Sequence, residues 1–454
     1  MTVRTTRALI DQALAEASTT REVVVRTGAI EDVGAIVSRR YPGRSVVIVA
    51  DERTFGIAGG SVIASLEAAH ADVANRVIFP AVPTLRPDLA HVATIVAAIG
   101  PETVPIAVGS GTINDLTKRA AFEVGVPYVV VATAASMDGY TASGAALVSE
   151  GVKQTFECPA PEVVVADLAI VRDAPPAMTA SGYGDLVGKV TAGADWIVAD
   201  ALGVEPIIPD VWSMVQDPLR DMVSEPERYF SGDESAIEEL FLGLVMTGLA
   251  IQVAGSTRPA SGSEHQFSHL WEMRGLEHNG ELVSHGMKVG MGSIVSTTLY
   301  ERLLDYPVAS LDIDAAIVAW PSWPDLERQI RNTHTDPMLI SKALEECRAK
   351  YLTHDELRSR LTTLREQWPS LSDRLRRQLL RSDQLADLLR RARCPIRPED
   401  IGLSTPQLRE SYLAAGQIRR RYTVFDVVTE LGLLNQFVDE LFASGGYWAE
   451  AEEA

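Results

Sequence analysis

Residues 104–115 read VPIAVGSGTIND, an apolar run that leads into a glycine-rich turn. The run 104–108 is typical of a strand buried in a parallel sheet, and the pattern of 113–125 predicts a helix. Glycines at such a turn let the backbone approach a pyrophosphate, and the helix N-terminus adds free N–H groups and a positive dipole end. Because the stretch lacks the last glycine of the usual dinucleotide-binding fingerprint, a plain strand-to-helix turn is an alternative.

The segments on either side of this stretch alternate between strand and helix patterns. We expect strands at 23–26, 45–50, 76–79 and 128–132, and helices at 30–40, 54–69 and 87–100. This order predicts an α/β fold with an N-terminal, doubly wound (Rossmann-like) parallel sheet, whose ligands bind at the carboxyl ends of the strands. Segment 142–172 carries short β-type runs, and we expect a hairpin or an extension of the sheet edge there.

Beyond Pro175 and Pro176 the pattern is helical almost to the end. Apolar stripes with helical spacing recur in 186–201, 236–254, 286–304, 355–366 and 425–442. The 454 residues therefore divide into an α/β domain over 1–174 and an all-α C-terminal domain over 175–454. The terminal run EAEEA at 450–454 is expected to be a frayed tail.

Composition limits the class of protein and its partners. The net charge of -20 argues against nucleic acid and anionic membranes as general partners, although a locally basic pocket can still take a small anionic substrate. Three cysteines without a CxxC pair favour a reducing compartment, and no secretion signal opens the sequence, so we expect a cytoplasmic protein. The longest apolar run, 241–254, is too short to span a bilayer and predicts a buried helix.

Histidines are few and clustered. Four of the eight, His265, His269, His278 and His285, fall within 21 positions of one another. His265 and His269 share one face of a predicted helix, and His285 opens a second helical pattern. Clustered imidazoles on neighbouring helices are what a divalent metal site needs. The alternative is one or two core histidines with satisfied hydrogen bonds.

Asp185 supplies the acid that such a site would use. It lies in SGYGDLVGK at 181–189, near the start of the first helix beyond the predicted boundary, where an aspartate is usually a cap. With His265 and His285 it gives one carboxylate and two imidazoles from three helices. That set leaves a coordination position open for substrate or water, as catalytic metal sites do. It suits zinc, nickel, iron or manganese.

Polar residues also follow two of the predicted strands. Asp51 ends the strand 45–50, where an acid can bind the adenine-ribose hydroxyls and repel a 2′-phosphate, or can simply cap the next helix. The run TAASMDGYT at 133–141 follows the strand 128–132, and its small residues and hydroxyls suit a nucleotide or substrate contact. Asp138 in this run precedes a glycine and could equally be a turn residue.

Several of these segments together resemble a known family. They are GSGTINDLTK (109–118), TAASMDGYTASGAAL (133–147), SGYGDLVGKVTAGADW (181–196), SGSEHQFSHLWEM (261–273), HGMKVG (285–290) and 401–434. They resemble the polyol and glycerol dehydrogenase branch of the iron-containing alcohol dehydrogenase and dehydroquinate synthase-like superfamily. Within it, the chain is identified as a member of the sn-glycerol-1-phosphate dehydrogenase family, in its bacterial AraM form, and the similarity covers nearly the whole chain.

The resemblance implies a role for individual residues. Asp185, His265 and His285 would bind the metal, and His269 and Asp138 would act at the substrate as catalytic residues. The dinucleotide would be held by Gly109, Ser110, Gly111, Thr112, Ile113, Thr133 and Ser136. The family often has a cofactor-contacting serine four residues after the aspartate of MDG, where this chain has Ala142. Either Ser143 replaces it through a local shift or the contact is missing.

The resemblance also implies an activity. It is NAD(P)-dependent interconversion of dihydroxyacetone phosphate and sn-glycerol 1-phosphate, or a close polyol phosphate, by hydride transfer in the interdomain cleft. Asp51 favours NAD over NADP, and the divalent metal would be zinc or nickel, with iron as another option. Lys153, Lys189 and Lys288 are candidates for binding the substrate phosphate. A homo-oligomer, dimer or larger, is expected.

Two other functions remain open. A sugar-phosphate cyclase of the dehydroquinate synthase type would use NAD transiently, with no net redox change, and generally has a glutamate where Asp185 stands. A catalytically silent member would bind metal and nucleotide as a sensor or scaffold. The presence of all three predicted metal ligands counts against the silent alternative.

Overall fold

The computed structural model describes residues 3–149 and 152–449, so the predicted tail at 450–454 lies outside the described residues. The chain forms two compact units. Unit 1 comprises Met1–Leu186 and Ser213–Ala260, and unit 2 comprises Val187–Trp212 and Ser261–Ala454. Helix α8 (Pro176–Ala201) contributes to both units. The predicted division after residue 174 falls just before this helix and, as a domain boundary, stays a prediction.

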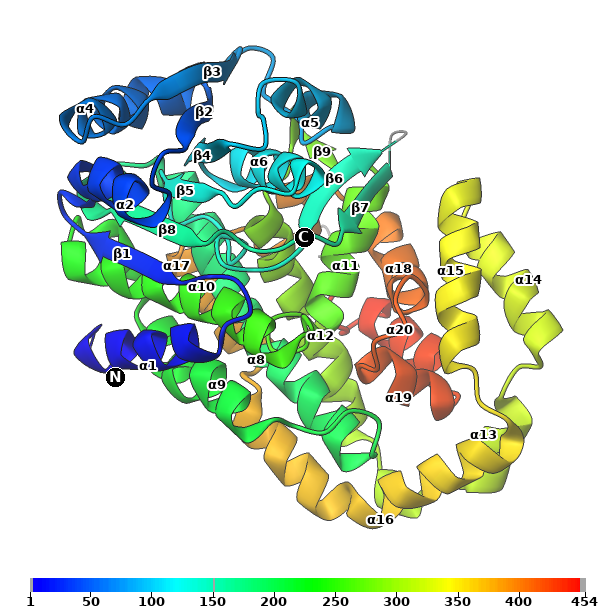
Figure 1. The fold of residues 1–454 in the computed structure, drawn as a ribbon. Helices are drawn as coiled ribbons and strands as arrows, with labels where there is room; N and C mark the ends of the chain where they lie inside the picture. The colour runs from blue at the N-terminus through cyan, green and yellow to red at the C-terminus, as the bar shows by residue number, and fades with distance from the viewer. Residues whose placement is uncertain (1–2, 150–151, 450–454) are drawn as a thin grey trace. The chain divides into compact units, whose positions relative to one another are not determined.

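Unit 1 is built on a six-stranded sheet in which all strands are parallel. Its strands are β1 (Glu22–Arg26), β2 (Ser45–Asp51), β3 (Val73–Phe79), β4 (Thr103–Gly109), β5 (Val129–Ala132) and β8 (Val163–Asp167). Their order across the sheet is β1-β8-β5-β4-β2-β3 (Figure 1). The inner strands carry valine and isoleucine on both faces, and β8 is buried along its whole length. The predicted parallel α/β sheet is confirmed.

Helices connect the strands and accompany the sheet in Figure 1. They are α2 (Val33–Arg40), α4 (Gly60–Ala68), α5 (Leu89–Val96) and α6 (Gly111–Val124). The helix predicted at 54–69 consists of a short helix, α3 (Glu52–Thr54), a π-helical turn, η2 (Phe55–Gly59), and α4. Local periodicity predicted the helical segment, but it does not distinguish an α-helical turn from a wider one.

Segment 142–172 differs in part from its prediction. Strands β6 (Ala145–Ser149) and β7 (Val152–Phe156) form the expected antiparallel hairpin. The following run, however, is not at the edge of the sheet, because β8 lies between β1 and β5 and pairs with both. The local pattern does not distinguish the two positions, because the edge strand β1 carries the similar run EVVVR; only the sheet order leaves β8 buried along its whole length and β1 only partly buried.

The order of the strands reverses between β2 and β4. After β2 the chain adds β3 on one side, and after β4 it adds β5 on the other. In doubly wound sheets the ligand binds at such a switch point, outside the carboxyl ends of the strands. Asp51 ends β2 and Gly109 ends β4. The predicted cofactor residues therefore lie at the edge where a ligand of this fold belongs.

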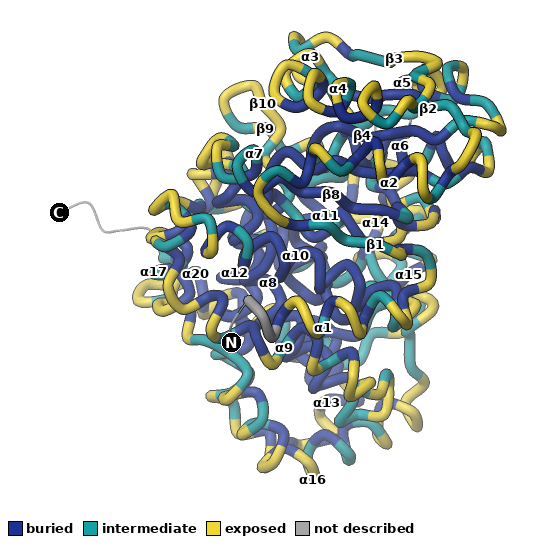
Figure 2. The backbone as a smooth tube through the Cα atoms, turned by 60° about the vertical axis from the view of Figure 1, so that its left-hand side comes forward, coloured by how far each residue is buried: buried dark blue, intermediate teal, exposed yellow. Residues whose placement is uncertain are grey.

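One helix of unit 1 is long and apolar enough to cross a membrane. It is α10 (Glu234–Ala254), and 89% of its most apolar window is buried inside the protein. In unit 1 it packs along α1 (Val3–Glu16), and Figure 2 shows it as a buried segment. The apolar run 241–254 therefore belongs to a core helix, as its length predicted. Helix α9 (Pro209–Ser224) precedes it, and α7 (Leu168–Arg172) follows β8.

Unit 2 is mainly helical, with a two-stranded ribbon of β9 (Glu277–His278) and β10 (Glu281–Leu282). Its first helices after α8 are α11 (Ser263–Met273) and α12 (His285–Asp305). The others are α13 (Ile313–Ala319), α14 (Trp323–Thr333), α15 (Pro337–Lys350), α16 (His354–Gln378), α17 (Ser382–Arg391), α18 (Thr405–Ala414), α19 (Val424–Glu430) and α20 (Leu434–Phe442). The stripe predicted at 425–442 is thus two helices, which Gly432, with φ of 73°, separates.

Four helices of unit 2, α8, α11, α12 and α19, meet at one buried carboxylate. Asp195 on α8 is fully buried and accepts hydrogen bonds from the backbone N–H of Ser263 (2.6 Å) and Val424 (2.8 Å). These are the first residues of α11 and α19. It also accepts from the hydroxyl of Tyr300 on α12 (2.6 Å). Because helix N-termini carry unsatisfied N–H groups and a positive dipole end, a carboxylate is favourable there.

We predict that Asp195→Asn lowers the stability of unit 2 by about 3 kcal/mol, because an amide removes the charge and directs N–H groups at N–H donors. Urea unfolding followed by tryptophan fluorescence measures the effect. Asp387→Asn, which disrupts the half-exposed ion pair with Arg390, is the matched control and should change stability by less than about 1 kcal/mol. Equal unfolding midpoints for the two variants would contradict the role of Asp195.

Candidate metal and cofactor site

The structure brings the three predicted metal ligands together. Asp185 on α8, His265 on α11 and His285 at the start of α12 each offer one ligand atom, and these atoms all lie within 4.8 Å of one another. Asp185 is two residues before the part of α8 that belongs to unit 2 with α11 and α12. One carboxylate and two imidazoles at this spacing form a donor set that fits a single divalent ion.

A buried carboxylate holds the ring of His265. Nδ1 of the His265 ring lies 2.7 Å from Oε1 of Glu264, and the Glu264 side chain is fully buried. Burial raises the pKa of Glu264, while hydrogen bonds from the backbone N–H of Gly262 (2.6 Å) and the hydroxyl of Thr191 (2.8 Å) act in the opposite direction. When Nδ1–H donates to this carboxylate, Nε2 is the nitrogen left for the ion.

A second carboxylate serves two histidines at once. Oε1 of Glu272 lies 3.2 Å from Nδ1 of His285, and its Oε2 lies 3.3 Å from Nδ1 of His269. Lys288 also pairs with Oε1, at 3.2 Å. Burial lowers the pKa of His269 well below the usual value, and the charge of Arg419 lowers it further, against the opposing effect of Glu272. A lowered pKa favours the neutral imidazole of His269, and the tautomer with a proton on Nδ1 would donate it to Glu272.

The three rings form a compact group. The ring centroids of His265 and His285 are 5.2 Å apart, and that of His269 lies 5.9 Å from the first and 6.3 Å from the second. A close crossing of α11 and α12 makes this possible, because a Cβ at Gly292 would lie 2.5 Å from the backbone oxygen of Glu264. Any side chain at Gly292 would push the two helices apart and separate the rings.

The loop after β5 is tied to the same helix as Asp185. The backbone N–H of Asp138 donates to Oδ2 of Asp185 at 2.9 Å, and the hydroxyl of Ser181 donates to the backbone oxygen of Ser136 at 3.0 Å. The side chain of Asp138 is 9% exposed. Of the predicted substrate residues, Asp138 thus contacts the predicted metal ligand Asp185, and His269 lies near the ring of His265.

Lys118 on α6 holds this loop through its backbone carbonyl groups. This role was not predicted from the sequence. The ammonium of Lys118 is buried and donates to the backbone oxygens of Gly139 (3.2 Å), Ala142 (2.8 Å) and Gly144 (2.9 Å). A single ammonium therefore satisfies three backbone carbonyl groups of an irregular segment. The sequence signal was only that Lys118 is one of six lysines and lies in a motif.

The predicted cofactor residues gather at the switch point of the sheet. Gly109, Ser110, Gly111, Thr112 and Ile113 form the turn from β4 into α6, and Thr133 follows β5, with its N–H donating to the oxygen of Gly109 at 3.2 Å. The side chain of Ser110 makes no capping hydrogen bond, so it leaves the first turn of α6 open to another acceptor. Thr133 and Ser136 are buried, whereas Ser143 is exposed, one residue beyond the buried Ala142.

Packing within the protein requires a glycine at position 109 but not at position 111. A Cβ at Gly109 would lie 2.8 Å from Cβ of Ile113, so packing within the protein excludes a side chain there. A Cβ at Gly111 would make only ordinary contact with Met137, at 3.6 Å. Packing therefore does not explain Gly111, and a ligand that approaches the backbone remains a reason for it.

Asp51 caps a helix, as the alternative interpretation expected. Its Oδ1 accepts from the N–H of Thr54 at 2.8 Å, and the hydroxyl of Thr54 accepts from the N–H of Asp51 at 3.2 Å. This reciprocal pair is a capping box at the start of α3. The cap occupies one carboxylate oxygen, and the proposed ribose contact would use the other.

Known proteins are similar to this chain. Residues 24–175 match the model of the iron-containing alcohol dehydrogenase family. The chain is 30% identical to a glycerol-1-phosphate dehydrogenase [NAD(P)+] of Geobacillus stearothermophilus over 419 residues, 90% of this chain and 92% of that relative. The chain belongs to the glycerol-1-phosphate dehydrogenase family. A relative of the same name from Halalkalibacterium halodurans is 38% identical over 259 residues, which span 57% of this chain and 65% of that protein.

Two solved structures share the fold of this chain. A glycerol dehydrogenase from Schizosaccharomyces pombe matches with a TM-score of 0.58 at 16% identity. The match covers 96% of this chain and 95% of that one. A probable glycerol dehydrogenase from Sinorhizobium meliloti 1021 has a TM-score of 0.60 at 15% identity, with 93% of this chain and 98% of that one covered. At this identity the likeness concerns the fold alone.

Sequence reasoning also missed the two carboxylates behind the imidazoles. Glu264 directly precedes His265, and Glu272 follows His269 by three residues, so both were within reach of a search for acids near the histidines. Of the lysines proposed for the phosphate, Lys189 is fully buried and Lys288 pairs with Glu272. The side chain of Lys153 lies outside the described residues.

We predict that Glu272→Gln weakens zinc binding by about 10- to 100-fold, because the carboxylate that holds the ring of His285 loses its charge. Competition with a chromophoric chelator measures the affinity. Glu281→Gln, an exposed residue of β10, is the control and should bind zinc like the unaltered protein. Unchanged zinc affinity in Glu272→Gln would show that this carboxylate does not support the ligand.

Proposed function

We propose that this chain is an NAD(P)-dependent, metal-dependent oxidoreductase that interconverts dihydroxyacetone phosphate and sn-glycerol 1-phosphate. Relatives named glycerol-1-phosphate dehydrogenase [NAD(P)+] align over most of the chain, which supports the activity. The observation that carries the proposal is the grouping of Asp185, His265 and His285 within 4.8 Å. A one-carboxylate, two-imidazole set with a position left for substrate is the arrangement that a metal-assisted ketone reduction needs.

When bound, the nicotinamide cofactor supplies the hydride and the divalent ion supplies a Lewis acid for the reacting carbonyl. Asp185, His265 and His285 would hold the ion, and Glu264 and Glu272 fix the two rings. The set suits zinc or nickel, with iron as another option.

His269 is proposed to manage the proton of the substrate hydroxyl. In the tautomer whose Nδ1–H donates to Glu272, its Nε2 is an acceptor that can take the hydroxyl proton when the alcohol is oxidised and return it in the reverse direction. Asp138, whose N–H binds Asp185, is proposed to contact the substrate from the loop after β5.

The dinucleotide is proposed to bind at the switch point of the sheet. The turn from Gly109 to Ile113 offers the N-terminus of α6 to the pyrophosphate, and Thr133, Ser136 and Ser143 are the proposed contacts from the neighbouring loop. A helix of 14 residues supports a substantial dipole at that end.

Further parts of the proposal rest on composition and family. We infer a homo-oligomer, a dimer or larger, that works in the cytoplasm and has neither nucleic acid nor membrane as a partner; the net charge of -20 supports the last point. The side chains of Cys158, Cys347 and Cys394 are buried thiols, which fits a reducing compartment. The cyclase alternative is not favoured, because the curated relatives are named dehydrogenases.

We predict that Asp185→Ala, His265→Ala and His285→Ala each lose bound metal and nearly all turnover. NADH oxidation by metal-reconstituted protein should be followed with dihydroxyacetone phosphate, dihydroxyacetone and glyceraldehyde 3-phosphate, together with elemental analysis. His269→Ala is the matched control, because it removes a neighbouring imidazole. It should keep its metal and lose turnover on the order of a hundredfold. Full metal occupancy in His285→Ala would remove that residue from the ligand set.

We predict a preference for NAD over NADP, because the carboxylate of Asp51 would face the 2′-phosphate of NADP. The ratio of kcat/KM values for the two cofactors measures it. Asp51→Asn, which keeps a side-chain oxygen for the cap, should narrow that ratio. Glu52→Gln, the adjacent residue, controls for the change of charge. A catalytic efficiency with NADP that equals or exceeds that with NAD would rule out this role.

A further inference from the structure

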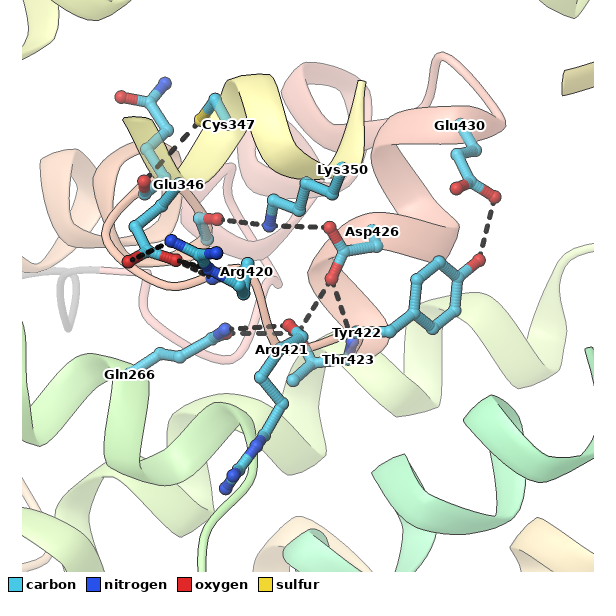
Figure 3. Close-up of polar contacts among 12 residues, drawn as sticks. Gln266, Glu346, Cys347, Lys350, Arg420, Arg421, Tyr422, Thr423, Asp426 and Glu430 are labelled. Atoms are coloured by element: carbon cyan, nitrogen blue, oxygen red, sulfur yellow. Dashed lines mark hydrogen bonds and ion pairs between the residues drawn. The ribbon is translucent and has the colours of Figure 1, made fainter. Parts of the chain in front are cut away.

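Three consecutive arginines connect η6 (Ala415–Gln417) to α19, and each has a different environment. Arg420 faces α15, where its guanidinium pairs with Glu345 and Glu346 at 2.8 Å each. Arg421 extends the other way and donates to the backbone oxygen of Ser261 at 2.7 Å. Figure 3 shows these two side chains on opposite sides of the segment.

The backbone of this segment is fixed against α11. The side chain of Gln266 donates to the backbone oxygen of Arg421 at 3.2 Å and accepts from the hydroxyl of Thr423 at 3.0 Å (Figure 3). On the other side of the arginines, Lys350 donates to the backbone oxygen of Gly416 at 2.6 Å. Gln266 and His269 are three residues apart and hence neighbours on the helix surface. The segment therefore runs beside the face of α11 that carries His269.

Arg419 lies on this segment between two contacts with α11: η6 packs on that helix, and Gln266 of the helix binds the backbone oxygen of Arg421. The charge of Arg419 depresses the pKa of His269, after the larger effect of burial. Burial also lowers the pKa of Arg419 itself, and the carboxylates of Glu346 and Glu272 act in the opposite direction. These electrostatic effects agree with a position of Arg419 beside α11. Yet no hydrogen bond joins its guanidinium to any of residues 3–149 or 152–449.

The lysines proposed from the sequence are already engaged. Lys288 pairs with Glu272 at 3.2 Å and donates to the backbone oxygen of Val283 at 2.7 Å. Lys189 is fully buried on α8, where its charge acts on Glu264. Arg419, by contrast, is a half-buried guanidinium with five N–H donors in a planar fork. A partly desolvated cation with unused donors is suited to a phosphate, which accepts such forks in pairs of bonds.

We propose that Arg419 binds the phosphate group of the substrate. This inference rests on the proposed function, in which one carbon and one oxygen separate the reacting C2 from the phosphorus. Arg419 would hold the phosphate end while His269 meets the oxygen on C2. The same residue then distinguishes a phosphorylated ketone from an unphosphorylated one.

The test compares Arg419→Gln with Arg419→Lys and with Arg420→Gln, which removes the neighbouring charge. In Arg419→Gln, kcat/KM for dihydroxyacetone phosphate should fall about 10- to 100-fold, mainly through KM, which is the effect of losing a hydrogen bond to a charged group. For unphosphorylated dihydroxyacetone it should stay within about twofold. Arg419→Lys should recover part of the loss, and Arg420→Gln should behave like the unaltered enzyme. An equal loss with both ketones, or an unchanged KM for the phosphorylated one, overturns the assignment.

Calorimetric titration with inorganic phosphate separates this inference from the proposed function. The unaltered, metal-loaded protein should bind phosphate, and Arg419→Gln should bind it at least about tenfold more weakly, with the same metal content and melting temperature. If the unaltered protein does not reduce dihydroxyacetone phosphate, the proposed function fails, and the titration still decides the role of Arg419. Equal phosphate affinity in the two proteins overturns the inference, whatever the activity.

Discussion

The carboxylate of Asp195 is the constraint on which the helical unit depends. It is fully buried, and the N-termini of α11 and α19 both point their first N–H groups at it. Two positive helix ends in contact with one negative charge give a strong, directional attachment in a place without solvent. The first turn of α11 carries His265, and the segment before α19 carries the three arginines. A shift of this one side chain would therefore move both parts of the candidate site. Gly262 leaves room for the contact, because a Cβ there would collide with the Asp195 carboxylate.

Polar groups in the candidate site are arranged in layers. The imidazoles of His265, His285 and His269 form the inner layer, and the carboxylates of Glu264 and Glu272 stand behind them. A carboxylate behind an imidazole fixes the tautomer and makes the outer nitrogen a better ligand for a cation. Lys288 compensates part of the acidic charge, since its ammonium lies 3.2 Å from Glu272. With carboxylates behind the imidazoles, this group of helical side chains favours binding of a cation.

In unit 1, the loop after β5 is likewise held by a single charged group, the ammonium of Lys118. Lys118 joins three carbonyls of the loop after β5, and that loop in turn donates the N–H of Asp138 to Asp185. The helix α6 that carries Lys118 also begins at the glycine turn proposed for the pyrophosphate. Helix α6 therefore carries the proposed cofactor turn at its start and, about two turns later, Lys118, which holds the loop that contacts Asp185.

By itself, the sequence determined the features that reside in one segment: the valine-rich strands, the glycine turn at 109–113, the helical spacing of His265 and His269, and the motif order of the family. Only the tertiary structure decided which segments meet. It placed β8 between β1 and β5 and set Glu272 against two histidines. The physical reason is that periodicity is written within a few turns of chain, whereas these contacts join distant residues, as Asp195 and Val424 do across 229 positions. Their partners are fixed by the packing of the whole fold and by the need to satisfy each buried polar group.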